Sequence, residues 1–170
     1  GVVDWIAKWE HRPDIVHVRM FLTQLSPVIL PLLRRVPALY HVVWYRPVCQ
    51  TGTKLLPGGS PCREPAGLAC YRSGCVPLRD WIPLQLQMWL WKRWRHVFAR
   101  IVANSHAVQG SLLADGVDAV EVIHNGVAIE SVTRVWSSTP LAVFAGRLVP
   151  EKGVDVLVQA FAQVVRNVPD

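Results

Sequence analysis

A short, glycine-bounded turn, Gly-Arg-Leu-Val-Pro-Glu-Lys-Gly at residues 146–153, separates two segments of different periodicity. Residues 141–145 before it form a continuous apolar run, which is typical of a buried strand. Residues 154–161 after it repeat their apolar positions with helical spacing. We expect Gly146 and Gly153 to allow backbone conformations that other residues avoid. The segment therefore predicts a strand, a tight turn and a helix.

The turn carries two cations, Arg147 and Lys152, next to the expected start of the helix. Free N–H groups and the positive pole of the helix dipole favour an anion at such a point. A planar guanidinium and a mobile ammonium together suit phosphate oxygens. The local pattern equally allows an ordinary surface turn, in which Arg147 pairs with a neighbouring carboxylate. The residues alone leave both interpretations open.

Similar alternation of strand-like and helix-like segments precedes the turn. The expected strands cover residues 14–18, 39–45, 101–103 and 120–123, and the expected helices cover residues 21–35, 83–100 and 106–113. Ser105 suits the N-cap of the last helix, and Gly116 suits its end. The alternation predicts an α/β fold with a doubly wound parallel sheet, covered on both faces.

A stretch rich in Gly, Pro and Cys interrupts this pattern at residues 48–79, where we expect a long irregular loop. It holds every cysteine of the chain, Cys49, Cys62, Cys70 and Cys75. Four thiols could hold one metal ion tetrahedrally, form two disulfides or remain free. Because the close Cys-x-x-Cys pairs of zinc ribbons are absent, the residues alone leave all three states open.

The helix expected at residues 83–100 is amphipathic. Its apolar arc comprises Leu86, Leu90, Trp91, Trp94, Val97 and Phe98, and the opposite face comprises Gln85, Lys92, Arg93, Arg95, His96 and Arg100. Trp89 falls among the basic residues. Such a face fits either solvent or the surface of an anionic membrane.

The net charge of +6 favours anionic partners. Nucleic acid is not expected, because the basic residues are scattered and no zinc-finger, helix-turn-helix or RNA-binding signature accompanies them. The sequence also lacks the phosphate loop of P-loop kinases and the Gly-x-Ser-x-Gly elbow of hydrolases. It shows neither a signal peptide nor an uncharged apolar stretch long enough to span a bilayer.

The turn Gly-Arg-Leu-x-x-Glu-Lys-Gly after a Val-Phe-Ala strand resembles the start of the second domain in retaining glycosyltransferases of family 4. The resemblance extends back through residues 101–105, 115–117 and 122–127, which are similar to the end of that family's first domain in order and spacing. It implies the GT-B fold, with two Rossmann-like domains of doubly wound parallel sheet, both truncated here.

On this resemblance, residues 1–126 are the later part of the acceptor-side domain, with a Cys-rich loop at residues 46–80. Residues 127–139 form a linker, and residues 140–170 begin the donor domain. The chain starts without Met and stops after a helix, so we expect it to be part of a longer protein and inactive in isolation.

The resemblance also implies the reaction: a hexosyltransferase moves a sugar from a nucleotide-diphosphate donor to an acceptor hydroxyl with retained configuration. Residues matching the family's diphosphate site are Gly146, Arg147 and Lys152, and residues expected on the acceptor side are His41, Tyr45, Arg46 and Lys54. The catalytic residues are not identified. Catalysis needs no cofactor, and a metal on the four cysteines would be structural.

The chain departs from the family pattern before Tyr45, where Val43 and Trp44 replace a common His-Asp pair. His41 lies on the same strand face as Val43 and would substitute only in part, although a lone His in a buried strand is more often a core residue.

Two other classes fit some of these features. A GT-B-like phosphorylase or epimerase would use the same phosphate clamp, and a metal-binding module built on the four cysteines would make the loop the functional part. For a transferase, the acceptor could be a saccharide, a lipid-linked molecule or a small molecule. We expect a cytoplasmic enzyme that contacts the anionic inner face of the membrane.

Overall fold

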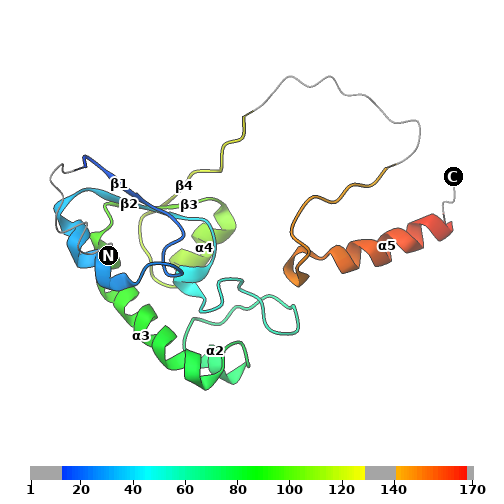
Figure 1. The fold of residues 1–170 in the computed structure, drawn as a ribbon, viewed down its shortest axis with the longest axis horizontal. Coiled ribbons are helices and arrows are strands. Elements are labelled where there is room, and N and C mark those ends of the chain that lie inside the picture. Colours follow the sequence, from blue (N-terminus) through cyan, green and yellow to red (C-terminus); the bar gives the residue numbers. More distant parts are fainter. Residues whose placement is uncertain (1–12, 129–140, 168–170) are drawn as a thin grey trace. The chain divides into compact units, whose positions relative to one another are not determined.

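The computed structural model describes residues 13–128 and 141–167. The chain divides into two compact units, Gly1–Gly126 and Val127–Asp170, and each is described by itself (Figure 1). Residues 129–139 of the expected linker lie outside the described residues.

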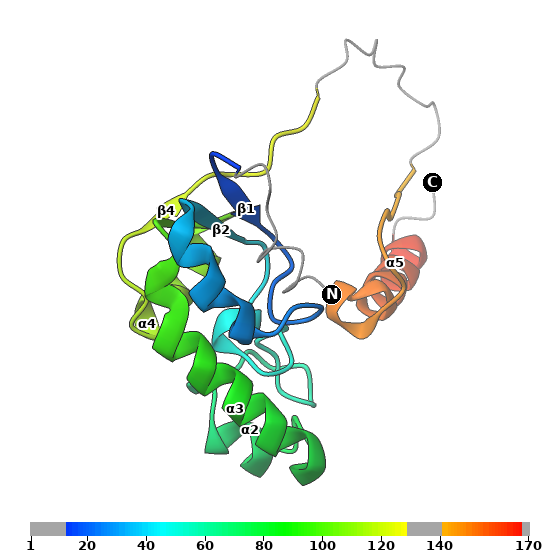
Figure 2. The same ribbon diagram turned by 60° about the vertical axis from the view of Figure 1, so that its left-hand side comes forward.

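The first unit is built on a four-stranded sheet in which neighbouring strands are parallel (Figures 1 and 2). The strands are β1 (Val16–Val18), β2 (Ala38–Val42), β3 (Arg100–Ala103) and β4 (Val120–Val122), and their order in space follows the chain. Tyr40 of β2 is in register with Val18 of β1 and Ile101 of β3. The predicted α/β class with a Rossmann-like parallel sheet is confirmed.

Helical segments pack against one face of this sheet. They are η1 (Pro27–Arg35), α3 (Leu78–Trp94), η3 (Arg95–Val97) and α4 (His106–Ala114). The strand residues of the core cluster belong to one alternating set, Val18, Ala38, Tyr40, Val42, Ile101, Ala103 and Val120. The other set, which includes His17 and His41, faces the opposite side. The four helical segments named here therefore cover the face that carries Tyr40.

Aromatic rings form the centre of this core. Trp91 of α3 is fully buried, and its ring centroid lies 5.4 Å from that of Tyr40 and 6.2 Å from those of Phe21 and Phe98. Most of these pairs meet edge to face or tilted, which aromatic quadrupoles favour. Burial raises the pKa of the Tyr40 phenol far above its ordinary value.

The segment expected as a helix at residues 21–35 is helical only from Pro27, and it is a 3-10 helix. Ser26 caps it by accepting a hydrogen bond from the Val28 amide, 3.4 Å away. Pro31 has no N–H and disfavours a continuous α-helix, which accounts for the tighter winding. Phe21 and Leu22 instead fill the core from a turn, and Leu22 has a positive φ of 69°.

Helix α3 begins at Leu78, five residues before the expected start at Pro83, and ends at Trp94. Pro83 lies inside the helix, so its use as a start signal was wrong. The expected apolar arc was also wrong at Leu86, which is 58% exposed, whereas Met88 and Trp91 are buried. The earlier start exposes an apolar stripe that comprises Leu78, Ile82, Leu86 and Trp89.

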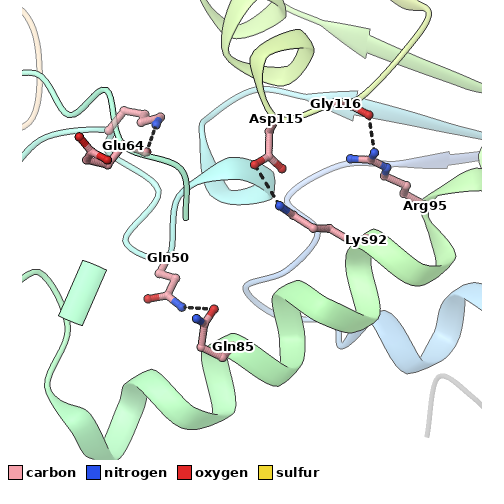
Figure 3. A network of polar contacts seen from close by, with 8 residues as sticks. Gln50, Glu64, Gln85, Lys92, Arg95, Asp115 and Gly116 are labelled. Carbon is pink, nitrogen blue, oxygen red and sulfur yellow. Dashed lines mark hydrogen bonds and ion pairs between the residues drawn. The ribbon is translucent and has the colours of Figure 1, made fainter. Parts of the chain in front are cut away.

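Several residues assigned to the polar face of α3 bind the rest of the unit (Figure 3). The Lys92 ammonium lies 3.1 Å from the Asp115 carboxylate, whose side chain is 7% exposed. Arg95 donates to the carbonyl of Gly116, and the Gln50 amide donates to Gln85 at 3.0 Å. These contacts tie α3 to the end of α4 and to the Cys-rich loop, so these polar side chains are bound within the unit, with the Lys92 side chain still 42% exposed.

The Cys-rich loop is mostly irregular, as expected. It contains η2 (Arg46–Val48), the unpredicted short helix α2 (Leu68–Arg72) and one isolated bridge between Leu55 and Pro61, while residues 78–80 belong to α3. Gly52 has a φ of +83°, and a Cβ there would lie 3.0 Å from the Trp44 ring. The loop therefore requires glycine at this turn.

The second unit contains η4 (Pro150–Lys152) and α5 (Val154–Asn167). The strand expected at residues 141–145 is not formed. A strand needs a neighbour for its backbone N–H and C=O groups, and this segment pairs with none in the described part of the chain. The apolar positions of α5, including Leu157 and Phe161, are exposed. None of the helices in the two described ranges is long and apolar enough to cross a bilayer.

Candidate functional site

The carboxyl edge of the parallel sheet gathers polar side chains from strands that are distant in sequence. The Asn104 amide, just after β3, donates to the Val43 carbonyl at the end of β2, 3.3 Å away. Ser105 caps α4, as predicted, by accepting from the Val108 amide at 3.4 Å. Open parallel sheets place ligands at this edge, so these residues lie where a ligand is expected.

Two histidines join this edge. His124, just after β4, lies 3.1 Å from the Asn104 carbonyl oxygen, which can only accept, so the imidazole donates. The His106 ring lies edge to face with it, with centroids 5.8 Å apart. Both imidazoles are exposed. Neither was a candidate from the sequence, although their position directly after β3 and β4 was the available signal.

His41 lies away from this group, inside β2 and on the face opposite the core. Its ring stacks on that of His17 with centroids 5.7 Å apart and planes inclined by 13°. Burial lowers the pKa of His41, and the positive charge of Arg19 and the neighbouring His17 lower it further. Its Nε2 is buried and has no hydrogen-bond partner within the described residues. His41 therefore favours its neutral form more than a free imidazole does, and its Nε2 is unused within the described residues.

Arg46 is engaged inside the fold. Its Nε donates to the Leu22 carbonyl at 3.1 Å, and an Nη reaches Gln87 of α3 at 3.5 Å. Burial lowers the pKa of Arg46, although the guanidinium remains charged at any ordinary pH. Tyr45 precedes it and packs against the core. Arg46 thus holds the strained turn at Leu22 to α3.

Arg46 also borders an open groove of about 490 Å³ between residues 22–28 and α3. The lining mixes apolar side chains with the further polar residues Thr23, Ser26, Asp80 and Gln87. The groove therefore carries two charged lining residues, Arg46 and Asp80.

Lys54 belongs to the interior of the Cys-rich loop. Its ammonium donates at 2.7 Å to the carbonyl of Glu64, which is labelled in Figure 3. The carbonyl of Lys54 accepts from the Cys62 amide at 2.8 Å. Its φ of +57° marks a sharp turn. The four expected acceptor-side residues thus have separate partners: His41 has His17, Tyr45 the core, Arg46 the Leu22 turn, and Lys54 the loop.

The four cysteines line one small cavity of about 10 Å³, together with Thr51, Glu64, Ser73 and apolar loop residues. All four are free thiols. Cys49 is buried, and the other three are partly exposed. As they stand, no three His, Cys, Asp or Glu side chains of the described residues are arranged to hold one metal ion. Metal binding by these cysteines stays a prediction.

The pKa values of the first and last of these cysteines, Cys49 and Cys75, shift in opposite directions. Burial raises the pKa of Cys49, but hydrogen bonds from the Thr51 hydroxyl and from the backbone amides of Lys54, Gly52 and Thr51 outweigh it, and the net pKa is lowered. The pKa of Cys75 is raised, first by burial and then by Cys70, Cys62 and Cys49. This mutual influence requires the four sulfurs to be near one another.

In the second unit, the turn that carries Arg147 and Lys152 is exposed. The Arg147 guanidinium lies 3.4 Å from the Glu151 carboxylate, which is the surface pairing considered from the sequence. The Arg147 side chain is still 74% exposed, and a pair of this kind contributes only about 0.2–1 kcal/mol. An anion can therefore displace Glu151 at small cost.

The backbone of this turn leads directly into α5. Lys152 is the last residue of η4, and Gly153, with a φ of +63°, accepts from the Leu157 amide at 3.0 Å in the first turn of α5. The expected special conformation is found at Gly153 but not at Gly146, whose φ lies outside the left-handed region. A Cβ at Gly146 would lie 3.2 Å from the Phe144 ring, so a larger residue there would require this ring to shift slightly.

In a comparison with known families, the model of Glycosyltransferase Family 4 matches residues 2–131. Searches of curated proteins and of solved structures give no match. The matched residues include the whole parallel sheet and its polar carboxyl edge. The chain therefore belongs to glycosyltransferase family 4.

Proposed function

We propose that the intact protein transfers a sugar from a nucleotide-diphosphate donor to an acceptor hydroxyl with retention of configuration. The observation that supports this most is the family match over the Rossmann-like unit. The polar edge formed by Asn104, Ser105 and His124 offers donors and acceptors that suit a sugar or phosphate.

The donor's diphosphate would bind the turn before α5. Arg147 and Lys152 are both exposed, and α5 is long enough for the free N–H groups of its first turn to attract an anion. As the sugar leaves, negative charge grows on the diphosphate. Two fixed cations stabilise that charge electrostatically, so this step requires no bound metal.

The direct test is sugar transfer by the intact protein, supplied with a panel of nucleotide-diphosphate sugars and mixed saccharide and lipid-linked acceptors. We expect release of the nucleoside diphosphate that depends on acceptor, and a product whose anomeric configuration by NMR equals that of the donor. Phosphate-dependent cleavage of a glycoside would indicate a phosphorylase, and interconversion of the nucleotide sugar an epimerase; either outcome would overturn the proposal.

We also propose that the exposed stripe of α3 rests on an anionic membrane surface. Leu78, Ile82, Leu86 and Trp89 are 51–61% exposed along one line of the helix. Arg79 and Arg93 are exposed on the same helix. Apolar side chains bordered by cations are the pattern of helices that lie in a membrane interface.

Membrane contact predicts weaker binding when this stripe is altered. Because Lys92 and Arg95 hold α4, the informative variant is Trp89→Gln with Arg93→Gln, which leaves those contacts intact. We expect binding of the intact protein to anionic vesicles to fall by at least about fivefold. Arg63→Gln, in the Cys-rich loop, removes the same charge and serves as the control. Equal binding by both variants, or undiminished binding to neutral vesicles, would contradict the contact.

A further inference from the structure

We propose that Cys49, Cys62, Cys70 and Cys75 together bind one soft divalent metal ion of the zinc type, which fastens the Cys-rich loop beneath the ligand edge of the sheet. This inference goes beyond the proposed sugar transfer, because it concerns how the loop is held rather than the reaction.

The first argument is convergence. The four thiols come from points spread over 27 residues, yet all line the same cavity. Its volume of about 10 Å³ suits a single small occupant rather than an organic ligand. Among its lining residues are no histidine and one carboxylate, Glu64, which is exposed. A set of four sulfur ligands selects zinc over hard ions such as magnesium or calcium.

The second argument is that little else holds the loop. Of residues 49–75, only Cys49, Gln50 and Gly52 are buried. Regular structure is limited to the bridge between Leu55 and Pro61 and to the five residues of α2. A segment that buries so little apolar surface usually needs a disulfide or a metal to be ordered.

The third argument concerns the individual sulfurs. The Cys49 sulfur lies 3.2 Å from the Thr51 hydroxyl, and the Gly52 amide donates to the Cys49 carbonyl at 3.1 Å, so a tight turn fixes the position of this buried ligand. Cys70 and Cys75 are joined by a backbone hydrogen bond from the Cys75 amide to the Cys70 carbonyl, 3.0 Å long. Because Cys62, Cys70 and Cys75 are partly exposed, their side chains can turn inward toward the buried Cys49 without repacking the core.

The consequence is a brace between the loop and α3. The loop leaves β2 at the carboxyl edge of the sheet and reaches α3 through the hydrogen bond between Gln50 and Gln85. A metal bound by Cys49, the neighbour of Gln50 in the chain, would hold this hydrogen bond in place. It would also steady the nearby segment that carries Arg46, which lines the open groove.

The test is metal content and metal substitution in the intact protein. We expect one zinc per chain after purification without chelator. After exchange into Co²⁺ we expect the d–d and sulfur-to-cobalt absorption of a tetrahedral thiolate site. Cys70→Ser, at a partly exposed ligand, is expected to lose both signals while the far-UV circular dichroism of the sheet unit persists. Ser73→Ala, which alters the same cavity without removing a thiol, should keep them.

Two results would overturn the proposal. One is a folded protein without zinc that takes up no Co²⁺ and whose four thiols all react with a thiol reagent. The other is a mass lower by two hydrogens for each of two disulfides, which reduction restores. Sugar transfer is measured separately in each variant, so failure of the metal site and failure of the proposed reaction are distinguishable.

Discussion

Replacement of both Arg147 and Lys152 by glutamine is expected to lower kcat for sugar transfer by at least about 10²-fold. The charge on the diphosphate rises as the sugar departs, so the loss should appear in kcat more than in KM. Both side chains are exposed, and the melting temperature should not change. The measurement is steady-state kinetics of the intact protein with its nucleotide sugar.

A matched control is available on the same helix. Arg166→Gln removes an exposed cation from the last turn of α5, far from its N-terminus. It should leave kcat within about twofold of the parent, because helix-end effects fall off within a turn. Arg147→Lys keeps the charge but removes the planar fork, and it should recover only part of the rate. A double variant with the parental kcat would exclude the turn from the reaction.

Substitution of Trp91 by alanine is expected to cost about 3–5 kcal/mol of unfolding free energy. The indole is fully buried and meets Phe21, Tyr40 and Phe98, so its removal opens a cavity that η1 and β2 cannot fill without moving. Denaturant unfolding, followed by circular dichroism, gives the value.

Trp89→Ala provides the comparison, because it removes the same side chain two residues earlier on α3. Trp89 is 60% exposed, and its loss should change stability by no more than about 0.5 kcal/mol. Equal costs for the two variants would mean that α3 packs on a different face from the one observed.

Local chemistry explains which elements could be predicted from sequence. The helix expected at residues 106–113 is α4 with one more residue, because Ser105 and Gly116 mark its ends with their own hydrogen bonds and backbone angles. The start of α3 was missed, because Pro83 is a strong start signal that the fold overrides. The 3-10 form of η1 follows from Pro31, but periodicity alone cannot distinguish it from an α-helix.

The site was less accessible to sequence reasoning than the fold. The edge position of Asn104 and Ser105 follows from the strand expected at residues 101–103, which ends directly before them. The partners of Arg46 were not, since Leu22 and Gln87 are 24 and 41 residues away and nothing local indicates them. The roles of Gly146, Arg147 and Lys152 in binding a donor stay predictions.

The strand order β1-β2-β3-β4 has a consequence for how the protein is made. Each strand needs only its predecessor as a template, so the sheet can grow in the direction of synthesis as the chain leaves the ribosome. The longest connection between successive strands joins β2 to β3, and it contains both the Cys-rich loop and Trp91. Until α3 has emerged, Phe21 and Tyr40 lack the Trp91 indole that contacts them in the folded unit. A nascent chain that pauses at this point therefore exposes apolar aromatic side chains, to which chaperones can bind.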